Sequence, residues 1–376
     1  YLSCPQCKKK FNVTQSVSPK GFYLTSHMPT YYKVDGSWQI PERSSQDCVA
    51  VVEDGKVFVR EFRNLKKGDK VVIASKTDAS EGVLKYGQGF SEEVFSRGGD
   101  FVEASNTSNY KLLYELLRAE KESEGNITWV LGPAVVFDYD TRNGLSRLAE
   151  NGYVQALLGG NAMATHDLEG GYLNTALGQD IYTQESDPLG HYNHLDTLNA
   201  IRKVGSIDEF INEGNVRDGF VKTLNRLGVP ITLAGSIRDD GPLPEVTGNV
   251  YDSLDNVRVA TDKSNLIICL ATTLHSASTA ETATSYRVDE NGNIVPVFIF
   301  TVDVTENAVR KVSAAREGIA VRTLVTNVQD FVVNLEKELV PEEYLSYDEE
   351  HVYEVEEASS EASIEDKKAM SQGREE

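Results

Sequence analysis

Short apolar segments alternate with helical ones from Tyr110 onward, and this alternation constrains the fold more than any other feature of the 376-residue chain. Strands of a parallel sheet are apolar over their whole length, because helices cover both faces of the sheet. The pattern therefore predicts an α/β fold with a doubly wound parallel sheet. We expect its strands over residues 127–131, 154–158, 230–233, 266–270, 296–302 and 321–325. Helices are expected over residues 111–121, 145–150, 195–204, 215–227 and 305–316.

The first part of the chain has a different pattern. Residues 20–75 are rich in aromatic and β-branched residues, and Asp54-Gly55 lies between two such segments, which is typical of a tight β-hairpin. We therefore predict a β-rich N-terminal domain over residues 19–108, in which residues 76–108 form a long loop or a disordered segment. The remaining divisions that we expect are a leader or linker over 1–18, the parallel-sheet domain over 109–340 and a disordered acidic tail over 341–376.

Charge and hydropathy exclude some partners. The formal net charge is −21, and much of the acidic excess lies between Glu336 and Glu376. Nucleic-acid-binding surfaces are basic, so we expect no nucleic-acid partner. No apolar run reaches the length of a membrane-spanning helix and no signal peptide is visible, so we expect no membrane partner and a cytoplasmic location. Because the sequence begins at Tyr1 rather than methionine, it is compatible with a missing upstream segment.

The four cysteines do not form a disulfide framework. Cys48 and Cys269 lie in or beside apolar segments and are expected to be buried thiols, which fits a reducing compartment. Cys4 and Cys7 have the spacing of half a zinc site, but no second pair follows at a suitable distance. We interpret them as free thiols in a linker, with a metal site completed by another chain or a missing segment as the alternative.

Small and polar residues follow four of the predicted strands. In open α/β sheets, ligands bind where the carboxyl ends of the strands meet, and glycines there let backbone N–H groups approach a phosphate. A single run of this kind is typical of an ordinary strand-to-helix turn, whereas four in one sheet favour a nucleotide site. The four runs are Gly132-Pro133-Ala134, Gly159 to Glu169, Gly235 to Pro244, and Thr272 to Ser276.

The run that follows strand 230–233 places charges of both signs in one loop. Asp239 and Asp240 can hold an ammonium group or act as a base, and Arg238 can pair with a substrate carboxylate. His275 follows another apolar strand and is a candidate for proton transfer. We predict these four residues to be catalytic. The structural alternatives are a surface turn with a local ion pair and a buried histidine bound to the backbone.

The dinucleotide fingerprint G-x-G-x-x-G is absent, so no standard site can be identified from a motif. Asp303 ends a buried strand and is either a partner for ribose hydroxyls or a cap for the next helix. The residues that we predict to contact a cofactor are Gly132, Pro133, Gly160, Asn161, Ala162, Asp167, Glu169, Ser236, Gly241, Thr272, Asp303 and Asn327.

Two groups of possible metal ligands are present. His166, Asp167 and Glu169 lie close together in sequence, and His191 and His194 form a second pair at a predicted helix start. Each group by itself offers too few ligands at a suitable spacing, and a solvated surface pair is the simpler interpretation of the two histidines. We therefore predict no metal site.

Several motifs together carry a family resemblance that spans about Gly21 to Leu335. The longest and most unusual is Ser236-Ile237-Arg238-Asp239-Asp240-Gly241-Pro242-Leu243-Pro244. Others are Leu65-Lys66-Lys67-Gly68-Asp69, Gly132-Pro133-Ala134-Val135-Val136, His166-Asp167-Leu168-Glu169 and Leu270 to Ser276. These motifs resemble the conserved region of the lysine-oxoglutarate reductase/saccharopine dehydrogenase (LOR/SDH) family, whose characterised members are NAD-dependent ornithine cyclodeaminases.

The resemblance implies a β-rich N-terminal domain followed by a Rossmann-like domain similar to deoxyhypusine synthase, which also binds NAD without the usual fingerprint. It implies conversion of L-ornithine to L-proline and ammonia, with hydride passing to NAD and back so that the cofactor is recycled. In some relatives this region follows an arginine dihydrolase domain in the same polypeptide. Because sheets of this type commonly assemble, we also expect a homo-oligomer, either a dimer or a tetramer.

Two other functions stay open at the level of sequence. One is a deoxyhypusine-synthase-like NAD-dependent transferase, which would use a lysine to carry an aminobutyl group to a protein. It is disfavoured because no lysine of this chain lies in a recognisable motif for that reaction. The other is a non-catalytic NAD-binding regulatory module. The sequence does not distinguish ornithine from other diamino acids.

Overall fold

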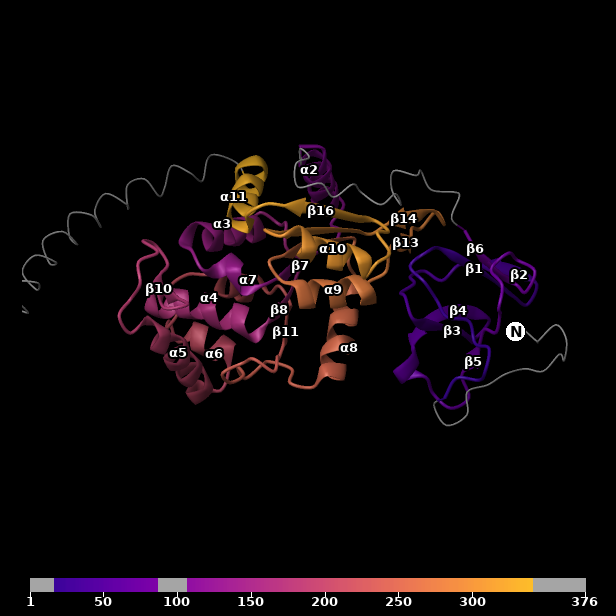
Figure 1. Cartoon of the computed structure of the whole chain (residues 1–376), viewed down its shortest axis with the longest axis horizontal. Helices are drawn as coiled ribbons and strands as arrows, with labels where there is room; N and C mark the ends of the chain where they lie inside the picture. The colour runs from indigo at the N-terminus through magenta and orange to yellow at the C-terminus, as the bar shows by residue number, and fades with distance from the viewer. Residues whose placement is uncertain (1–16, 87–106, 341–376) are drawn as a thin grey trace, which may run out of the picture.

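The computed structural model describes residues 17–86 and 107–340, and most of the predicted leader, most of the predicted loop and the acidic tail lie outside these residues. Its N-terminal part is β-rich (Figure 1). Two antiparallel sheets have the orders β2-β1-β6 and β4-β3-β5. Their strands are β1 (Thr30–Val34), β2 (Ser37–Gln39), β3 (Cys48–Glu53), β4 (Lys56–Glu61), β5 (Lys70–Val71) and β6 (Val83–Lys85), and a 3-10 turn, η1 (Phe62–Asn64), follows β4.

The hairpin between β3 and β4 confirms the turn that the sequence predicts. Asp54 and Gly55 both have positive φ, of 47° and 77° respectively. Positive φ at both central residues is what a two-residue hairpin turn requires. The turn brings Val52 opposite Val57, and both side chains are buried in the core of this part of the chain.

A six-stranded parallel sheet forms the centre of the larger, α/β part, in the order β11-β8-β7-β12-β15-β16. Counted along the chain, this is the order 3-2-1-4-5-6 of Rossmann folds. The predicted doubly wound parallel sheet is therefore confirmed. Its strands are β7 (Ile127–Leu131), β8 (Ala156–Gly160), β11 (Ile231–Ala234), β12 (Leu266–Leu270), β15 (Phe298–Asp303) and β16 (Val321–Val325).

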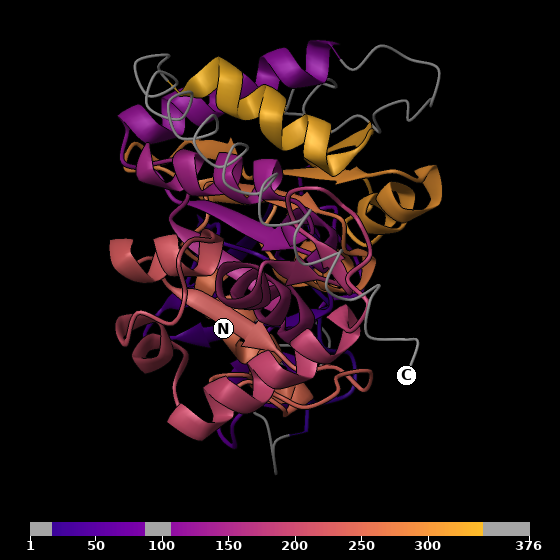
Figure 2. The same cartoon turned by 90° about the vertical axis from the view of Figure 1, so that its left-hand side faces the viewer.

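Helices cover both faces of this sheet, as Figure 2 shows. One face is covered by α2 (Thr107–Glu122), α3 (Tyr139–Glu150), α4 (Asn161–Leu173), α7 (Phe220–Leu227) and α11 (Val328–Leu339). The other is covered by α8 (Val250–Thr261), α9 (Thr273–Thr282) and α10 (Glu306–Ala314). An outer layer on α4 consists of α5 (Gly190–Val204) and α6 (Ile207–Asn212). The short elements are η2 (Pro133–Val136), β9 (Thr175–Ala176), β10 (Gln179–Asp180), β13 (Tyr286–Val288) and β14 (Ile294–Pro296).

Successive residues of the central strands are buried in different cores. Trp129 packs on the face of α3 and α11, whereas its neighbour Val130 packs on the face of α8 and α9. Ile268 and Ile267 alternate in the same way on β12. Burial on both faces is the physical reason for the continuous apolar runs in the sequence.

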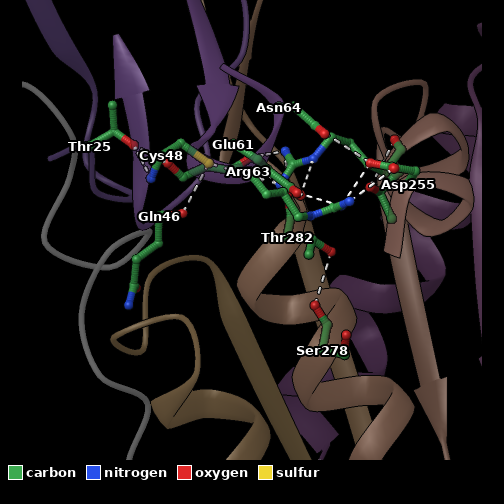
Figure 3. Close-up of polar contacts among 12 residues, drawn as sticks. Thr25, Gln46, Cys48, Glu61, Arg63, Asn64, Asp255, Ser278 and Thr282 are labelled. Carbon is green, nitrogen blue, oxygen red and sulfur yellow. Dashed lines mark hydrogen bonds and ion pairs between the residues drawn. The ribbon is translucent and has the colours of Figure 1, made fainter. Parts of the chain in front are cut away.

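Polar contacts join the β-rich part to the α/β part (Figure 3). Arg63, which follows β4, makes two hydrogen bonds of 2.9 and 2.7 Å to Asp255 on α8. Arg258 on α8 donates from Nε to Glu61 at 2.6 Å, and the Ser45 hydroxyl donates to the Thr282 carbonyl at 2.7 Å. Arg258 and Thr282 lie near the C-terminal ends of α8 and α9, which lead back to the amino ends of the strands. These contacts of residues 17–86 therefore lie on α8 and α9 and not at the carboxyl edge of the sheet.

The structure also bears on the predicted burial of the cysteines and on the search for a membrane-spanning helix. Cys48 and Cys269 are buried as predicted, and burial raises the pKa of their thiols to about 11 and about 12. Cys4 and Cys7 lie outside the described residues. Within residues 17–86 and 107–340, no helix has the length and apolar character needed to cross a membrane.

Candidate functional site

The strand order reverses between β7 and β12, and ligands of open α/β sheets bind at the carboxyl ends of strands at such a point. The backbones that follow these two strands are in close contact. A Cβ atom on Gly132 would lie 1.9 Å from the carbonyl oxygen of Ala271. This contact requires glycine at position 132 whether or not a ligand binds there, so the predicted cofactor contact of Gly132 stays a prediction.

The helix that follows β7 is not open to an anion. Asp138 caps α3, and its carboxylate accepts a hydrogen bond from the backbone N–H of Thr141 at 2.9 Å. Between β7 and this cap the chain forms η2, with Pro133 at its start. The N-terminus of α3, where a Rossmann fold usually holds a pyrophosphate, is thus capped by a carboxylate of the chain itself.

Two other helices offer free N-termini at the same edge. Helix α4 begins after Gly160 and α9 begins after Thr272, and within the described part of the chain no side chain caps either helix. Backbone N–H groups in the first turn of such helices are unpaired and favour a negative charge. Three predicted cofactor contacts, Gly160, Ala162 and Thr272, thus lie at these two helix starts, and they stay predictions.

His275 on α9 lies against the end of β8. A Cβ atom on Gly160 would be 2.8 Å from Cε1 of His275, so glycine makes room for the imidazole. Burial lowers the pKa of His275, and the charge of Asp239 acts in the opposite direction. Asp239 is therefore near enough for its charge to act on the imidazole. An imidazole that is neutral near pH 7 can accept a proton.

The loop from Gly235 to Asn249 follows β11, and the Asn161 side chain holds it in place through two hydrogen bonds. The Asn161 amide donates to the Gly241 carbonyl at 3.0 Å, and its oxygen accepts from the backbone N–H of Leu243 at 2.8 Å. Only 2% of Asn161 is exposed. The predicted cofactor contact of Asn161 receives no support, because its polar atoms hold the loop. Gly241 contributes to the site through this loop anchor.

Within the loop, the two aspartates have different surroundings. The Asp239 carboxylate accepts from the backbone N–H of Ser236 at 2.7 Å, and the Ser236 hydroxyl accepts from the N–H of Arg238 at 3.0 Å. Asp240 is exposed, and its Oδ2 lies 3.7 Å from Nε2 of His194. The exposed Arg238 side chain makes no ion pair among the residues that the structure describes. Arg238 and Asp240 therefore offer opposite charges toward solvent.

A cavity of about 180 Å³ lies beside this loop, between α8 and α9. Leu158, Ala234, Leu254 and Val257 give it a largely apolar wall, and His275 lines it as well. A larger cavity of about 780 Å³ lies between the β-rich part and the C-terminal end of α8. It is far along the helix from the carboxyl edge, and residues such as Arg43, Arg258 and Asp262 that line it are not among the predicted site residues.

Two of the predicted cofactor contacts, Asp167 and Glu169, are buried and bound to other residues of the chain. Asp167 is 1% exposed, and its carboxylate binds Arg142 and the backbone N–H groups of Phe220 and Val221. Glu169 is fully buried within the described residues and binds His166 and Thr175. Their cofactor contacts stay predictions, because the polar groups of both residues are used within the chain.

Asp303 ends β15, two residues before the N-cap of α10, and Asn327 is the N-cap of α11. Asp303 accepts hydrogen bonds from the backbone and hydroxyl of Thr305, and Thr305 itself is the N-cap of α10, so Asp303 supports the cap instead of forming it. Rossmann folds place the ribose-binding acid about 20 residues after the first glycine turn, whereas Asp303 ends the fifth strand. The Asn327 side chain caps α11 through the N–H of Gln329 at 2.8 Å. Neither contact supports cofactor binding.

Sequence reasoning missed the position of His194. It lies on α5, but its ring is next to that of His166 on α4, with ring centroids 4.5 Å apart. The exposed His191 does not join them. The two histidine-containing segments are 28 residues apart, and nothing in their sequence indicates that α5 packs on α4.

Comparison with known proteins identifies the family. Residues 111–335 match the family described as arginine dihydrolase ArgZ-like, C-terminal, Rossmann fold. An ornithine cyclodeaminase of Archaeoglobus fulgidus is 35% identical over 77% of this chain and 68% of its own length. The crystal structure of a putative LOR/SDH protein from Methanococcus maripaludis superposes with a TM-score of 0.76 and 29% identity, covering 88% of this chain and 98% of that one.

A second solved structure was determined with ligands. The ternary complex of AgrE with ornithine and NAD⁺ matches with a TM-score of 0.55 and 28% identity, covering 89% of this chain and 46% of the AgrE chain. The family resemblance predicted from the sequence motifs is thereby confirmed. The chain belongs to the ArgZ-like C-terminal Rossmann-fold family, which it shares with archaeal ornithine cyclodeaminases.

Proposed function

We propose that this chain is an NAD-dependent ornithine cyclodeaminase, which converts L-ornithine to L-proline and ammonia. The observation that carries the proposal is the match over most of the chain to a relative named ornithine cyclodeaminase. The match to an AgrE structure that contains ornithine and NAD⁺ gives independent support. Both matches include the α/β part, whose carboxyl edge holds the candidate site.

The residues at this edge fit the parts of NAD. The uncapped N-termini of α4 and α9, at Gly160 and Thr272, favour the pyrophosphate, and the apolar cavity between α8 and α9 suits a flat ring. When bound, NAD supplies the removal and return of a hydride at the α-carbon of the substrate. The chain must bind the amino acid, hold its two amines and move protons.

The free charges of the Gly235–Asn249 loop suit an amino-acid substrate. We assign Arg238 to the substrate carboxylate, because a guanidinium pairs with a carboxylate through two parallel hydrogen bonds. We assign Asp240 to one of the two amines and His275 to proton transfer, since burial lowers the pKa of its imidazole. Asp239 is assigned to the shape of the loop through its bond to the Ser236 N–H.

The test uses purified protein with L-ornithine and a catalytic amount of NAD⁺, and it follows proline, ammonia and NADH together. We expect proline and ammonia in equal amounts without net NADH. Accumulation of NADH without proline would instead show an amino-acid dehydrogenase. NAD binding without any product would leave the regulatory module or the transferase.

The role of Asp240 is tested separately. An Asp240→Asn variant should lose about 10- to 100-fold in kcat/KM for ornithine, the effect of one lost charge-assisted hydrogen bond. The matched control is Asp35→Asn, which removes the same charge from the exposed turn between β1 and β2. Full turnover in the Asp240 variant would remove this residue from the proposed site.

Three wider expectations belong to the same proposal. They are a homo-oligomer (dimer or tetramer), a cytoplasmic location and an arginine dihydrolase domain upstream in the complete polypeptide. Light scattering of the purified protein tests the first, and cell fractionation tests the second. The sequence of the full-length transcript tests the third.

A further inference from the structure

Glu169 and two histidines from different helices converge beside the candidate site. His166 and Glu169 lie one turn apart on α4, and His194 lies on α5, which packs against α4. Nδ1 of His166 is 2.7 Å from Oε2 of Glu169, and Nδ1 of His194 is 3.8 Å from the same oxygen. One ligand atom from each of the three residues lies within 4.8 Å of the others. The 2.7 Å contact is a hydrogen bond, and a bound cation would take the place of its proton.

Two of the three residues are buried, and the third, His194, has 15% of its side chain exposed. Glu169 is 0% exposed and His166 is 7% exposed. Nδ1 of His194 is buried and has no hydrogen-bond partner among the described residues. A buried polar atom without a partner is unfavourable unless a ligand completes its surroundings. The unpaired nitrogen faces the Glu169 oxygen, where a shared cation would lie.

Outer contacts hold these side chains in place. The Thr175 hydroxyl donates to the second oxygen of Glu169 at 2.7 Å, and the Asn193 amide donates to that hydroxyl at 2.9 Å. Nε2 of His194 faces the Asp240 carboxylate at 3.7 Å. Metal-bound histidines commonly direct their second nitrogen to a carboxylate, and metal-bound carboxylates are themselves hydrogen-bonded.

We propose that His166, Glu169 and His194 form a binding site for a divalent transition-metal ion, with Zn²⁺ as the expected ion. Two imidazole nitrogens and one carboxylate suit zinc, whereas Ca²⁺ and Mg²⁺ prefer oxygen ligands throughout. Three protein ligands leave one position open for water or another small ligand. The two ligand groups that are each too small in the sequence become one site because α5 packs on α4. The proposal does not rest on the proposed cyclodeaminase activity.

The experiment titrates Zn²⁺ into the chelator-treated full chain, with affinity measured by competition against a chromophoric chelator. All proteins carry Cys4→Ser and Cys7→Ser, so that these thiols do not contribute. We expect one Zn²⁺ per chain, and binding at least about tenfold weaker in His194→Ala and Glu169→Gln. His191→Ala is the matched control, because this exposed histidine lies three residues earlier on the same helix, and it should bind as the parent does.

A second readout separates metal binding from folding. Zn²⁺ should raise the midpoint of thermal unfolding of the parent and of His191→Ala, but not that of His194→Gln, which keeps a polar side chain of similar size. Absence of Zn²⁺ binding by the parent at micromolar concentration overturns the proposal. Equal weakening in His191→Ala and His194→Ala also overturns it, because it would show adventitious binding at the surface.

Discussion

Replacing Asp167 by asparagine should destabilise the folded chain strongly, because Asp167 neutralises a buried arginine. Nε of Arg142 donates to the Asp167 carboxylate at 2.8 Å, and each side chain is 1% exposed. The same carboxylate accepts from the backbone N–H groups of Phe220 and Val221 at 3.2 and 2.7 Å, where α7 begins. Removing one partner of a buried ion pair costs about 3–5 kcal/mol, and asparagine keeps the volume while it removes the charge.

The matched control is Asp218→Asn. Asp218 binds the same guanidinium at 2.9 Å, but its side chain is 39% exposed. Water can replace part of this contact, so the loss should be about 1 kcal/mol or less. Urea unfolding, followed by circular dichroism, measures both variants. Similar small losses in the two variants would refute the reasoning. Under native conditions Asp167→Asn should leave NAD affinity unchanged. A large loss of NAD affinity would instead support the cofactor contact that the sequence predicts for Asp167.

Two further predictions concern the described backbone and a buried histidine. Gly132→Ala should lower the free energy of unfolding by about 1–3 kcal/mol, because the new Cβ would lie 1.9 Å from the Ala271 carbonyl oxygen. Gly248→Ala is the control and should not be destabilised in this way, because nothing lies within 4 Å of its Cβ. Equal urea midpoints for the two variants would contradict this prediction. Burial, with the charge of Arg316, lowers the pKa of His27 to about 3. Between about pH 6.5 and 3 the unfolded chain protonates this histidine and the folded chain does not. The free energy of unfolding should therefore fall by about 1.4 kcal/mol per pH unit as the pH drops from about 6.5 toward 3. Urea unfolding at several pH values should show a shallower slope for His27→Gln, and an unchanged slope would reject the prediction.

The sheet could be predicted from sequence because its strands are buried on both faces. Residues 127–131 and 266–270 were predicted with the bounds that β7 and β12 have in the structure. Helix α3 was predicted to begin at Leu145 but begins at Tyr139, because its first turns are polar and bury Arg142 in an ion pair. Helix α8 was not predicted, and only Thr261 is fully buried in it, so its apolar periodicity is weak.

The candidate site could be predicted only in part, for a different reason. The rule that ligand residues follow the carboxyl ends of strands brings His275 and Asp239 together, since strand ends meet wherever the sheet forms. Which partner a polar side chain binds depends on how distant segments of the chain pack together in the tertiary structure. Asn161 holds the loop at Gly241, and Asp167 pairs with Arg142, although both lie in the run that follows β8. The meeting of His194 with Glu169 likewise depends on helix packing.

The missing G-x-G-x-x-G has a structural consequence for where a dinucleotide can lie. In Rossmann folds the first glycine turn lets the backbone approach the pyrophosphate, and the next helix N-terminus attracts its charge. In this chain the space beside Gly132 is taken by the Ala271 carbonyl, and Asp138 occupies the N-terminus of α3. The helix N-termini without a side-chain cap are instead those of α4 and α9, at Gly160 and Thr272. A dinucleotide at this edge should therefore be held from α4 and α9, and the helix after the first strand should contribute little.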